Sequence, residues 1–242
     1  MADLELVDES WDTALCVVAH PDDLEFGTAA AIARWTAQGK RVVYAVLTSG
    51  EAGIDSLAPD ECRPVREAEQ REAAALVGVD TVEFLGLADG TLEYGVPLRR
   101  VVCAAVRRHR PEVVITNNLR ETWIGGLLNQ ADHVATGRAT LDATRDAANR
   151  WVFPEGRGES AWAGVRQVWA AGSPRSTHGV ETTETFDRGV ASLAAHRTYN
   201  EGLGWPGFRP DTFLARGGRA AGARLDVEMA TVFEVFSLAG GM

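Results

Sequence analysis

The feature that most constrains the fold is an alternation of short apolar runs with amphipathic segments along the first half of the chain. The apolar runs are rich in β-branched residues, as in strands that are buried on both faces of a sheet. They cover residues 13–20, 41–48, 81–86 and 112–118. Because a helical segment follows each run, this order predicts an α/β fold with a parallel sheet, right-handed crossovers and helices on both faces.

The segments between the runs are predicted to be helices because their apolar residues recur at helical spacing. They cover residues 27–40, 64–77 and 97–108, and a further helix follows His133. In a sheet of this kind, ligands bind beyond the carboxyl ends of the strands. Polar side chains just after each strand are therefore the first candidates for a functional site.

The chain after Trp151 is less regular. Residues 165–171 and 230–239 are predicted strands, and residues 186–199 are a predicted helix, with glycine-rich loops between them. We expect residues 1–242 to form a single domain with a sheet that is mixed at its edge. Residues from about 151 to 242 are expected to form a smaller α/β region that closes over the site.

Composition narrows the class of partner. The chain has 242 residues and a formal net charge of −10. Nucleic acids and anionic membranes are bound through basic surfaces, so we expect neither as a partner, whereas a small molecule fits. The three cysteines are scattered, which supports neither a disulfide framework nor a cysteine-based zinc site. Since the sequence shows no secretory leader and no long apolar run, a cytoplasmic location is expected, and a homo-oligomer is left open.

The first candidate site is Ala19–Asp23, AHPDD, at the carboxyl end of the first predicted strand. His20 and Asp23 are three residues apart, so a turn between them lets an imidazole nitrogen and a carboxylate oxygen converge on one ion. Zinc takes such ligands at about 2.0–2.2 Å. Asp22 lies between the two and is free to act as a base.

The second candidate is Asn129–His133, NQADH, which follows the fourth strand after a long loop. His133 would open the next helix on the same side of the sheet. Two histidines and one aspartate from separated parts of the chain leave one position for water, as catalytic zinc sites do. Asp132 would orient a ligand imidazole or cap the helix.

Each of these residues also has a purely structural alternative. A histidine at a strand end often packs in the core, and an aspartate pair before a helix serves as N-cap and favours the helix dipole. Spacing alone leaves the metal site and these structural roles equally open. The candidates strengthen one another because they fall on the same rim of one sheet.

Several segments, in this order, resemble the PIG-L/LmbE family of metal-dependent deacetylases. They are AHPDD, TSGEAG, REAEQREAAALVGV, FLGLADG and ADHVATGRA, with AAHRTY further downstream. The resemblance implies a Rossmann-like, LmbE-like α/β fold. It also implies removal of N-acyl groups, chiefly acetyl, from amino sugars and their conjugates.

By this resemblance, His20, Asp23 and His133 match the metal ligands and Asp22 matches the general base. The expected ion is zinc (Zn²⁺), and Fe²⁺ or another divalent metal is the alternative. Zinc lowers the pKa of a bound water to about 7, and Asp22 would accept the proton of that water.

Further candidate positions lie on the substrate side. Arg66 and Asp89 match family positions that contact sugar hydroxyls, and their structural alternatives are a helix-face ion pair and a turn residue. Gln130 departs from the family pattern, because several members have a histidine there that assists as an acid. Glutamine cannot deliver a proton, so Asp22 performs both transfers or another group such as His196 helps. The alternative for His196 is a buried core histidine.

Other functions stay open at this point. The same site could cleave a longer acyl amide, as an amidase acting on a larger conjugate such as a mycothiol-type S-conjugate. A non-catalytic α/β sugar-binding module is the alternative from a different class. Dinucleotide binding is disfavoured because the first strand leads into HPDDLEFG rather than a Gly-x-Gly-x-x-Gly turn.

Overall fold

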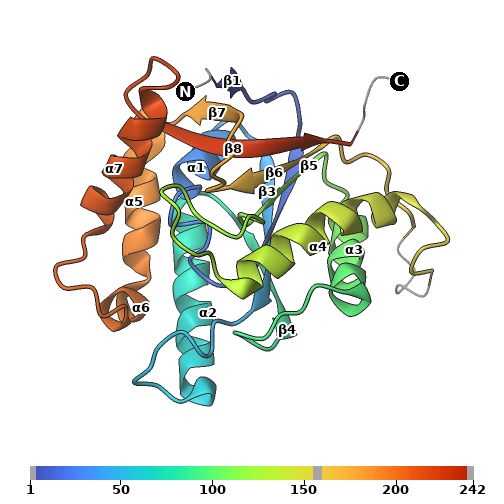
Figure 1. The fold of residues 1–242 in the computed structure, drawn as a ribbon, viewed down its shortest axis with the longest axis horizontal. Coiled ribbons are helices and arrows are strands. Elements are labelled where there is room, and N and C mark those ends of the chain that lie inside the picture. Colours follow the sequence, from blue (N-terminus) through green and yellow to red (C-terminus); the bar gives the residue numbers. More distant parts are fainter. Residues whose placement is uncertain (1–3, 155–159, 239–242) are drawn as a thin grey trace.

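The computed structural model describes residues 4–154 and 160–238, which form one mixed sheet with helices on both sides (Figure 1). The strands are β1 (Glu5–Leu6), β2 (Thr13–Val18), β3 (Arg41–Thr48), β4 (Thr81–Leu87), β5 (Val113–Thr116), β6 (Gln167–Ala171), β7 (His178–Glu181) and β8 (Ala230–Ser237). Their order across the sheet is β1-β7-β8-β6-β5-β2-β3-β4. From β6 to β4 neighbouring strands are parallel, whereas β8 runs antiparallel to both β6 and β7. The predicted α/β fold, parallel with a mixed edge, is confirmed.

The helices cover the two faces of this sheet. They are α1 (Ala29–Ala37), α2 (Pro59–Leu76), α3 (Val96–His109), α4 (Ala131–Ala148), α5 (Phe186–Ala195), α6 (Arg197–Gly202) and α7 (Pro210–Gly222), with a 3₁₀ turn, η1, at Thr183–Thr185. One face is covered by α1 and α2, with α5 packed against both of these helices, and the other face is covered by α3 and α4 (Figure 1). This arrangement leaves the carboxyl ends of the parallel strands as the edge where loops from both faces meet.

The core lies in two layers because successive side chains of a strand point to opposite faces. On β2, Ala14, Cys16 and Val18 pack into the layer under α1, while Leu15 and Val17 pack into the layer under α3 and α4. Burying each large apolar side chain of this kind stabilises the fold by roughly 1.5–3 kcal/mol. The central strand is therefore held from both sides, which keeps the loop that follows it in place.

Two helices differ from the predicted ranges. Helix α2 begins at Pro59 rather than Pro64, because Pro59 suits the first helical position and Asp60 and Glu61 favour the positive end of the helix dipole. The helix predicted over residues 186–199 is two helices, α5 and α6.

The break between α5 and α6 falls at His196, whose ψ of 59° is not helical. A side chain of α2 stabilises the new helix start, since Glu69 accepts the backbone N–H of Thr198 at 2.6 Å. The chain therefore turns at His196 to bring α6 against α2.

Strands β6, β7 and β8 come from the segment after Trp151, for which the sequence predicts a smaller subdomain. They extend the same sheet that β2 to β5 begin. This part of the chain also supplies α5, which packs against α1 and α2, α6, which packs against α2, and α7, which packs against α5 and β8 (Figure 1). None of the helices in the described parts of the chain combines the length and hydropathy needed to cross a bilayer.

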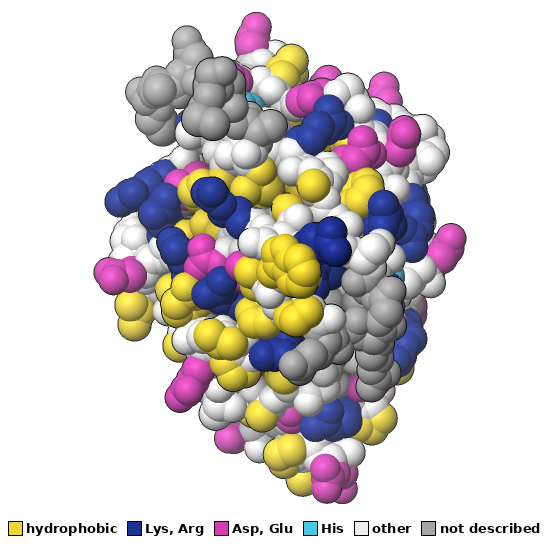
Figure 2. Space-filling model, turned by 90° about the vertical axis from the view of Figure 1, so that its right-hand side faces the viewer, with side chains coloured by type: hydrophobic (Ala, Val, Ile, Leu, Met, Phe, Trp, Pro, Cys, Tyr) yellow, Lys and Arg dark blue, Asp and Glu magenta, His cyan; other side chains and the backbone are white. Residues whose placement is uncertain are grey.

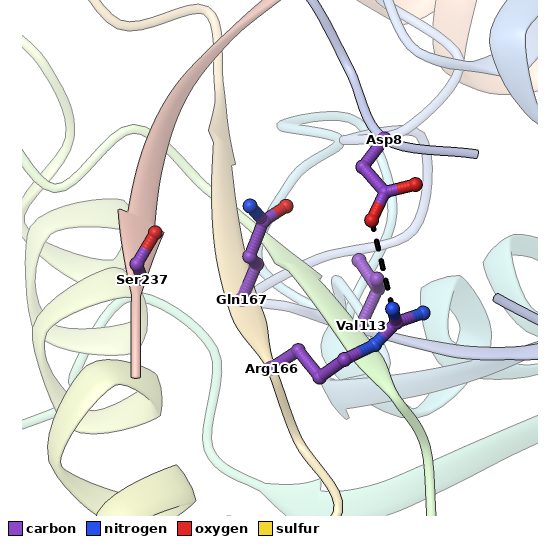
Figure 3. A pocket seen from close by; sticks show the side chains of 5 residues that line it. All are labelled: Asp8, Val113, Arg166, Gln167 and Ser237. Carbon is purple, nitrogen blue, oxygen red and sulfur yellow. Dashed lines mark ion pairs between the residues drawn. The ribbon is translucent and has the colours of Figure 1, made fainter. Parts of the chain in front are cut away.

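A cavity of about 150 Å³ lies at the amino ends of β5 and β6 (Figure 3). It is lined by Asp8, Val113, Arg166, Gln167 and Ser237. Asp8 and Arg166 form an ion pair of 3.5 Å there. The side of the molecule seen in Figure 2 carries basic and acidic side chains interspersed with hydrophobic ones. The residues singled out from the sequence follow the carboxyl ends of the strands, so the chemistry is at the opposite end of the sheet from this cavity.

Candidate metal centre

The strand order reverses its direction between β2 and β5. From β2 the chain proceeds outward to β3 and β4, and it then returns to place β5 on the other side of β2. Ligands of open α/β sheets bind at such a switch point, where the loops after the two strands diverge. His20 follows β2, and His133 lies in the first turn of α4 after β5. Their ring centroids are 5.1 Å apart, so the two predicted candidates meet.

Three atoms that can bind a metal converge here: Nδ1 of His20, Oδ1 of Asp23 and Nε2 of His133. Nδ1 of His20 lies 3.2 Å from Nε2 of His133 and 3.7 Å from Oδ1 of Asp23. The Asp23 oxygen lies 3.0 Å from Nε2 of His133. Tetrahedral ligands at about 2.0–2.1 Å from zinc stand about 3.3 Å from one another. The spacing of the three atoms therefore fits one small divalent cation.

The other nitrogen of His20 faces two carboxylates. Nε2 lies 3.0 Å from Oδ1 of Asp89 and 3.2 Å from Oδ2 of Asp132. By geometry alone this group could also hold a cation. However, both oxygens of Asp132 already accept backbone N–H groups, from Gly90 at 2.8 Å and Leu92 at 3.0 Å.

Asp89 is similarly occupied, since its Oδ2 accepts the backbone N–H of Ala52 at 2.9 Å. Carboxylates placed in this way typically support a ligand histidine from behind. The Nε2–H of His20 is therefore donated to Asp89 and Asp132, and the lone pair on Nδ1 points toward Asp23.

His133 is oriented by an amide. Its Nδ1 lies 3.1 Å from Oδ1 of Asn129, which leaves Nε2 to face His20 and Asp23. Asn129 is buried, and its Nδ2 donates to the backbone oxygens of Asn118 and Arg120. Both imidazoles thus present one bare nitrogen to the same point.

The histidines and carboxylates of this cluster shift one another's pKa values. Burial alone would lower the pKa of His20, but the carboxylates of Asp132, Asp23 and Asp89 raise it well above its ordinary value. Burial alone would raise the pKa of Asp23, but the imidazoles of His133 and His20 hold it well below its usual range. Cations and protons compete for such nitrogens, so the cluster favours a positive species between the rings.

Asp22 lies on the rim of the same cluster with a φ of +83°, a left-handed conformation that is uncommon outside glycine. Its carboxylate is buried, and Oδ2 accepts a hydrogen bond of 3.0 Å from Nη2 of Arg66. Burial raises the pKa of the Asp22 carboxyl above its ordinary value, and the Arg66 guanidinium opposes this effect without cancelling it. A buried carboxylate with a raised pKa beside a metal-type cluster suits a general base.

Arg66 is itself buried. Its Nη2 also donates to the backbone oxygen of Pro21 at 2.7 Å, and its guanidinium lies 3.6 Å from the ring centroid of Tyr199. The absence of a side chain at Gly50 makes room for it, because a Cβ there would stand 2.9 Å from Nε of Arg66. Nε and Nη1 have no hydrogen-bond partner among the described residues. Two donors of Arg66 are thus left over next to Asp22.

The remaining candidates from the sequence are placed differently. Asp89, predicted on the substrate side, turns its carboxylate toward His20 and Ala52. Gln130 is exposed at the N-cap of α4, three residues before His133. His196 is fully buried, and its Nε2 lies 3.7 Å from Oε2 of Glu25.

Three residues of the cluster are not singled out by the sequence: Asn129, Gln70 and Tyr199. Gln70 carries a detectable signal, because it stands one helical turn after Arg66 and therefore shares its face. Asn129 lies within the quoted NQADH segment, but an asparagine just before a helix usually has a capping role. Tyr199 reaches the site only because the chain breaks at His196.

Comparison with known proteins decides the family. The family model described as PIG-L, GlcNAc-PI de-N-acetylase, matches residues 15–144, which is more than half of the chain. The chain belongs to the PIG-L family. The matched range contains the predicted metal-binding cluster, and the resemblance noted from the sequence is confirmed.

Two curated relatives illustrate the range of PIG-L proteins that the chain resembles. A "Probable N-acetyl-alpha-D-glucosaminyl L-malate deacetylase 2" of Bacillus anthracis is 32% identical over 136 residues, which cover 53% of this chain and 58% of that protein. A 1D-myo-inositol 2-acetamido-2-deoxy-alpha-D-glucopyranoside deacetylase of Acidothermus cellulolyticus is 29% identical over 234 residues, covering 76% of this chain and 78% of that protein. The match thus spans little more than half the length of the first relative.

Solved structures share the fold over nearly the whole chain. The N,N′-diacetylchitobiose deacetylase from Pyrococcus horikoshii has a TM-score of 0.84 at 20% identity, covering 95% of this chain and 85% of that one. GalB, the 4-carboxy-2-hydroxymuconate hydratase from Pseudomonas putida, has a TM-score of 0.75 at 19% identity, covering 96% of this chain and 98% of that one. Since a deacetylase and a hydratase share this architecture, the reaction must be argued from the site rather than the fold.

Proposed function

We propose that this PIG-L protein is a metal-dependent hydrolase that removes an N-acyl group, in the simplest case acetyl, from an amino sugar or an amino-sugar conjugate. The observation that carries the proposal is the convergence of three ligand atoms, from His20, Asp23 and His133, beside the buried carboxylate of Asp22. The names of the two curated relatives, both deacetylases of N-acetylated glucosamine derivatives, support the substrate class.

We assign zinc to the site, with Fe²⁺ as the alternative. Two imidazole nitrogens and one carboxylate oxygen are donors that zinc accepts, and a three-ligand set leaves a position open. A divalent cation bound there would polarise the amide carbonyl of the substrate and make a water molecule acidic near neutral pH.

Asp22 is assigned the role of general base. Its carboxylate stands next to the ligand Asp23 in the chain, and its Oδ2 is held by Arg66 at 3.0 Å. Because burial raises its pKa, Asp22 can accept a proton from water and later release it to the leaving amine nitrogen. One carboxyl group then performs both transfers, with no net consumption of protons by the protein.

Gln130 is assigned a supporting role at the open side of the site. It is exposed at the start of α4, where the positive end of the helix dipole favours negative charge. Its amide can donate a hydrogen bond to the carbonyl oxygen as negative charge develops there. It cannot supply a proton, which is why the proton for the leaving nitrogen is assigned to Asp22.

We also propose that the chain works as one cytoplasmic catalytic unit. Residues on both sides of Trp151 share one sheet, Tyr199 of the later segment lies against Arg66, and His196 faces Glu25. An amidase acting on a larger conjugate uses the same residues and differs only in what the loops around the site accept.

The test is hydrolysis by the zinc-loaded protein, read as release of acetate from N-acetylglucosamine and N,N′-diacetylchitobiose and as release of the longer acyl group from a mycothiol-type S-conjugate. Wild-type protein is expected to hydrolyse at least one of them, and Asp22→Asn is expected to lower kcat by about 10²–10⁴-fold, since it keeps the shape and removes the base. Asp142→Asn, an exchange on α4 at a half-buried carboxylate that pairs with Arg138, is the control. Equal rates for wild type and Asp22→Asn would remove the assigned base, and binding without turnover would favour a sugar-binding module.

A further inference from the structure

One peptide unit of the site is held on both of its edges by the same helix. Nη2 of Arg66 donates to the backbone oxygen of Pro21 at 2.7 Å, and Oε1 of Gln70 accepts the backbone N–H of Asp22 at 2.7 Å. This oxygen and this N–H belong to one trans peptide, in which they point in opposite directions. Arg66 and Gln70 stand one turn apart on α2, so the peptide lies clamped between two side chains of one helix face.

The clamped peptide fixes the backbone conformation of Asp22, whose φ of +83° is disfavoured for a residue with a Cβ. A strained conformation of this kind persists only where the surroundings hold it. The N–H of Asp22 is bound by Gln70 and its carboxylate by Arg66. Both contacts come from buried side chains, so water does not replace them easily.

Gln70 is in turn oriented by a buried carboxylate. Its Nε2 donates to Oε1 of Glu25 at 3.0 Å, and Glu25 is fully buried. A flipped amide would turn its N–H groups toward the N–H of Asp22 and its oxygen toward the carboxylate, losing both hydrogen bonds. Glu25 therefore fixes which end of Gln70 faces Asp22.

The far side of Glu25 faces His196. Oε2 of Glu25 and Nε2 of His196 are 3.7 Å apart, and neither has a hydrogen-bond partner among the described residues. Both side chains are fully buried. A buried polar group without a partner is costly, so the unpaired atoms of Glu25 and His196, at the far end of the hydrogen bonds that lead from Asp22, call for a role beyond packing.

We propose that Gln70 and Glu25 are positioning residues that hold the Pro21–Asp22 peptide and thereby aim the Asp22 carboxylate at the reacting water. The proposal rests on the function assigned to Asp22 above. Neither residue touches substrate; each acts through the backbone of Asp22. His196 lies next to Glu25 on the side away from Gln70, and we count it with these two positioning residues.

The test uses full-length zinc-loaded protein and four variants: Gln70→Leu, Gln70→Glu, Glu25→Gln with Gln70→Glu, and Ser192→Ala. Gln70→Leu removes both hydrogen bonds. Gln70→Glu places two buried carboxylates opposite each other. Adding Glu25→Gln puts an amide donor at position 25 opposite the carboxylate acceptor at position 70, so the hydrogen bond is restored with donor and acceptor exchanged. Ser192→Ala is the matched control, because it removes a buried hydrogen bond to the same helix, at Ala73, without contacting Asp22.

The first readout is amide hydrogen exchange of the segment 19–26, measured by mass spectrometry. Faster exchange is expected in Gln70→Leu and in Gln70→Glu, with recovery in the double variant and no change in Ser192→Ala. The second readout is turnover of whichever of the three substrates above the wild-type protein hydrolyses. We expect kcat to fall about 10- to 100-fold in Gln70→Leu while KM stays within about twofold and zinc content is retained, because a small misplacement of a reacting group has that effect.

Wild-type exchange and wild-type kcat in Gln70→Leu would overturn the proposal. The proposal would also be overturned if the double variant showed the same exchange and the same kcat as Gln70→Glu alone. The double variant restores the hydrogen bond between positions 25 and 70, and recovery is expected from that bond. If wild-type protein hydrolyses none of the three substrates, the proposed function fails by itself, and the exchange of residues 19–26 still decides whether Gln70 holds the peptide.

Discussion

The amide oxygen of Asn129 lies 3.1 Å from Nδ1 of His133 and fixes the face that this histidine presents to the cluster. The two N–H donors of the amide are directed to the backbone oxygens of Asn118 at 2.7 Å and Arg120 at 2.9 Å. The oxygen must therefore be the atom that faces His133, and it accepts the Nδ1–H. The lone pair of Nε2 is left pointing at His20 and Asp23.

Replacing Asn129 is expected to weaken metal binding. Asn129→Ala removes the acceptor for Nδ1–H, frees the ring to rotate, and should lower the affinity for Zn²⁺ by about 10- to 100-fold in a chelator competition. Asn149→Ala, beyond the other end of α4, is the control and should bind as wild type does. An unchanged zinc affinity in Asn129→Ala would show that His133 needs no such partner.

Asp89 has two candidate roles, which the zinc affinity and the KM of a variant distinguish. The resemblance to the family implies a contact with sugar hydroxyls, whereas the structure turns its Oδ1 toward Nε2 of His20 at 3.0 Å. If the carboxylate supports the ligand histidine, Asp89→Asn should raise the dissociation constant for Zn²⁺ about tenfold and change KM little. A raised KM with unaltered zinc affinity would instead favour the sugar contact.

Gly50 is expected to tolerate no side chain. Its φ is +63°, and a Cβ would stand 2.9 Å from Nε of Arg66 and 3.0 Å from Cδ of Pro21. Gly50→Ala should lower the free energy of unfolding by about 1–3 kcal/mol, measured by urea denaturation. Gly27, where a Cβ meets nothing within 4 Å, is the matched control, and Gly27→Ala should not destabilise. Equal effects of the two exchanges would contradict the crowding at Gly50.

Glu9 is expected to contribute stability that is full above its unfolded pKa and declines at lower pH. Its carboxylate accepts hydrogen bonds from Nε of Arg34 at 3.1 Å and Nε1 of Trp35 at 2.7 Å. Burial alone would raise the pKa of Glu9, but the Arg34 guanidinium and the Trp35 indole hold it below the ordinary 4.5. Because the folded pKa is the lower one, this stability is present above pH 4.5 and is lost as the pH falls through the folded pKa.

The check is urea unfolding of wild type and Glu9→Gln at two pH values. Arg34 is about a third exposed, so water screens the pair, and the expected loss at pH 7 is no more than about 1 kcal/mol. At pH 3 the two proteins should differ less. A difference that is the same at both pH values would mean that the charge of Glu9 has no part in it.

The sheet and the candidate metal cluster could be predicted from the sequence because their signals are local. Buried strands such as residues 41–48 are nearly continuous apolar runs, and a strand end places its next polar residue, here His20, at the site. Helix α7 shows no such signal, since Gly217 and Gly218 interrupt its apolar spacing and glycine disfavours helices. Strand β7 has four residues, too short for a period to show.

The outer parts of the site depend on contacts between distant segments. Whether Asp89 faces a sugar or His20 is decided by the loop after β4 meeting the loop after β2, which no spacing encodes. Tyr199 stands against Arg66 because the chain turns at His196, and that turn depends on Glu69 of another helix. Residue types thus predict the candidate ligands, whereas the side chains that orient them follow from tertiary packing.

The most direct test is the metal content of purified protein after exposure to Zn²⁺, measured by elemental mass spectrometry with folding checked by circular dichroism. Wild type and Asp22→Asn should each retain about one ion per chain, whereas Asp23→Ala and His133→Ala should lose it, because only the latter remove a ligand. Full zinc content in folded Asp23→Ala and His133→Ala would contradict the assigned centre.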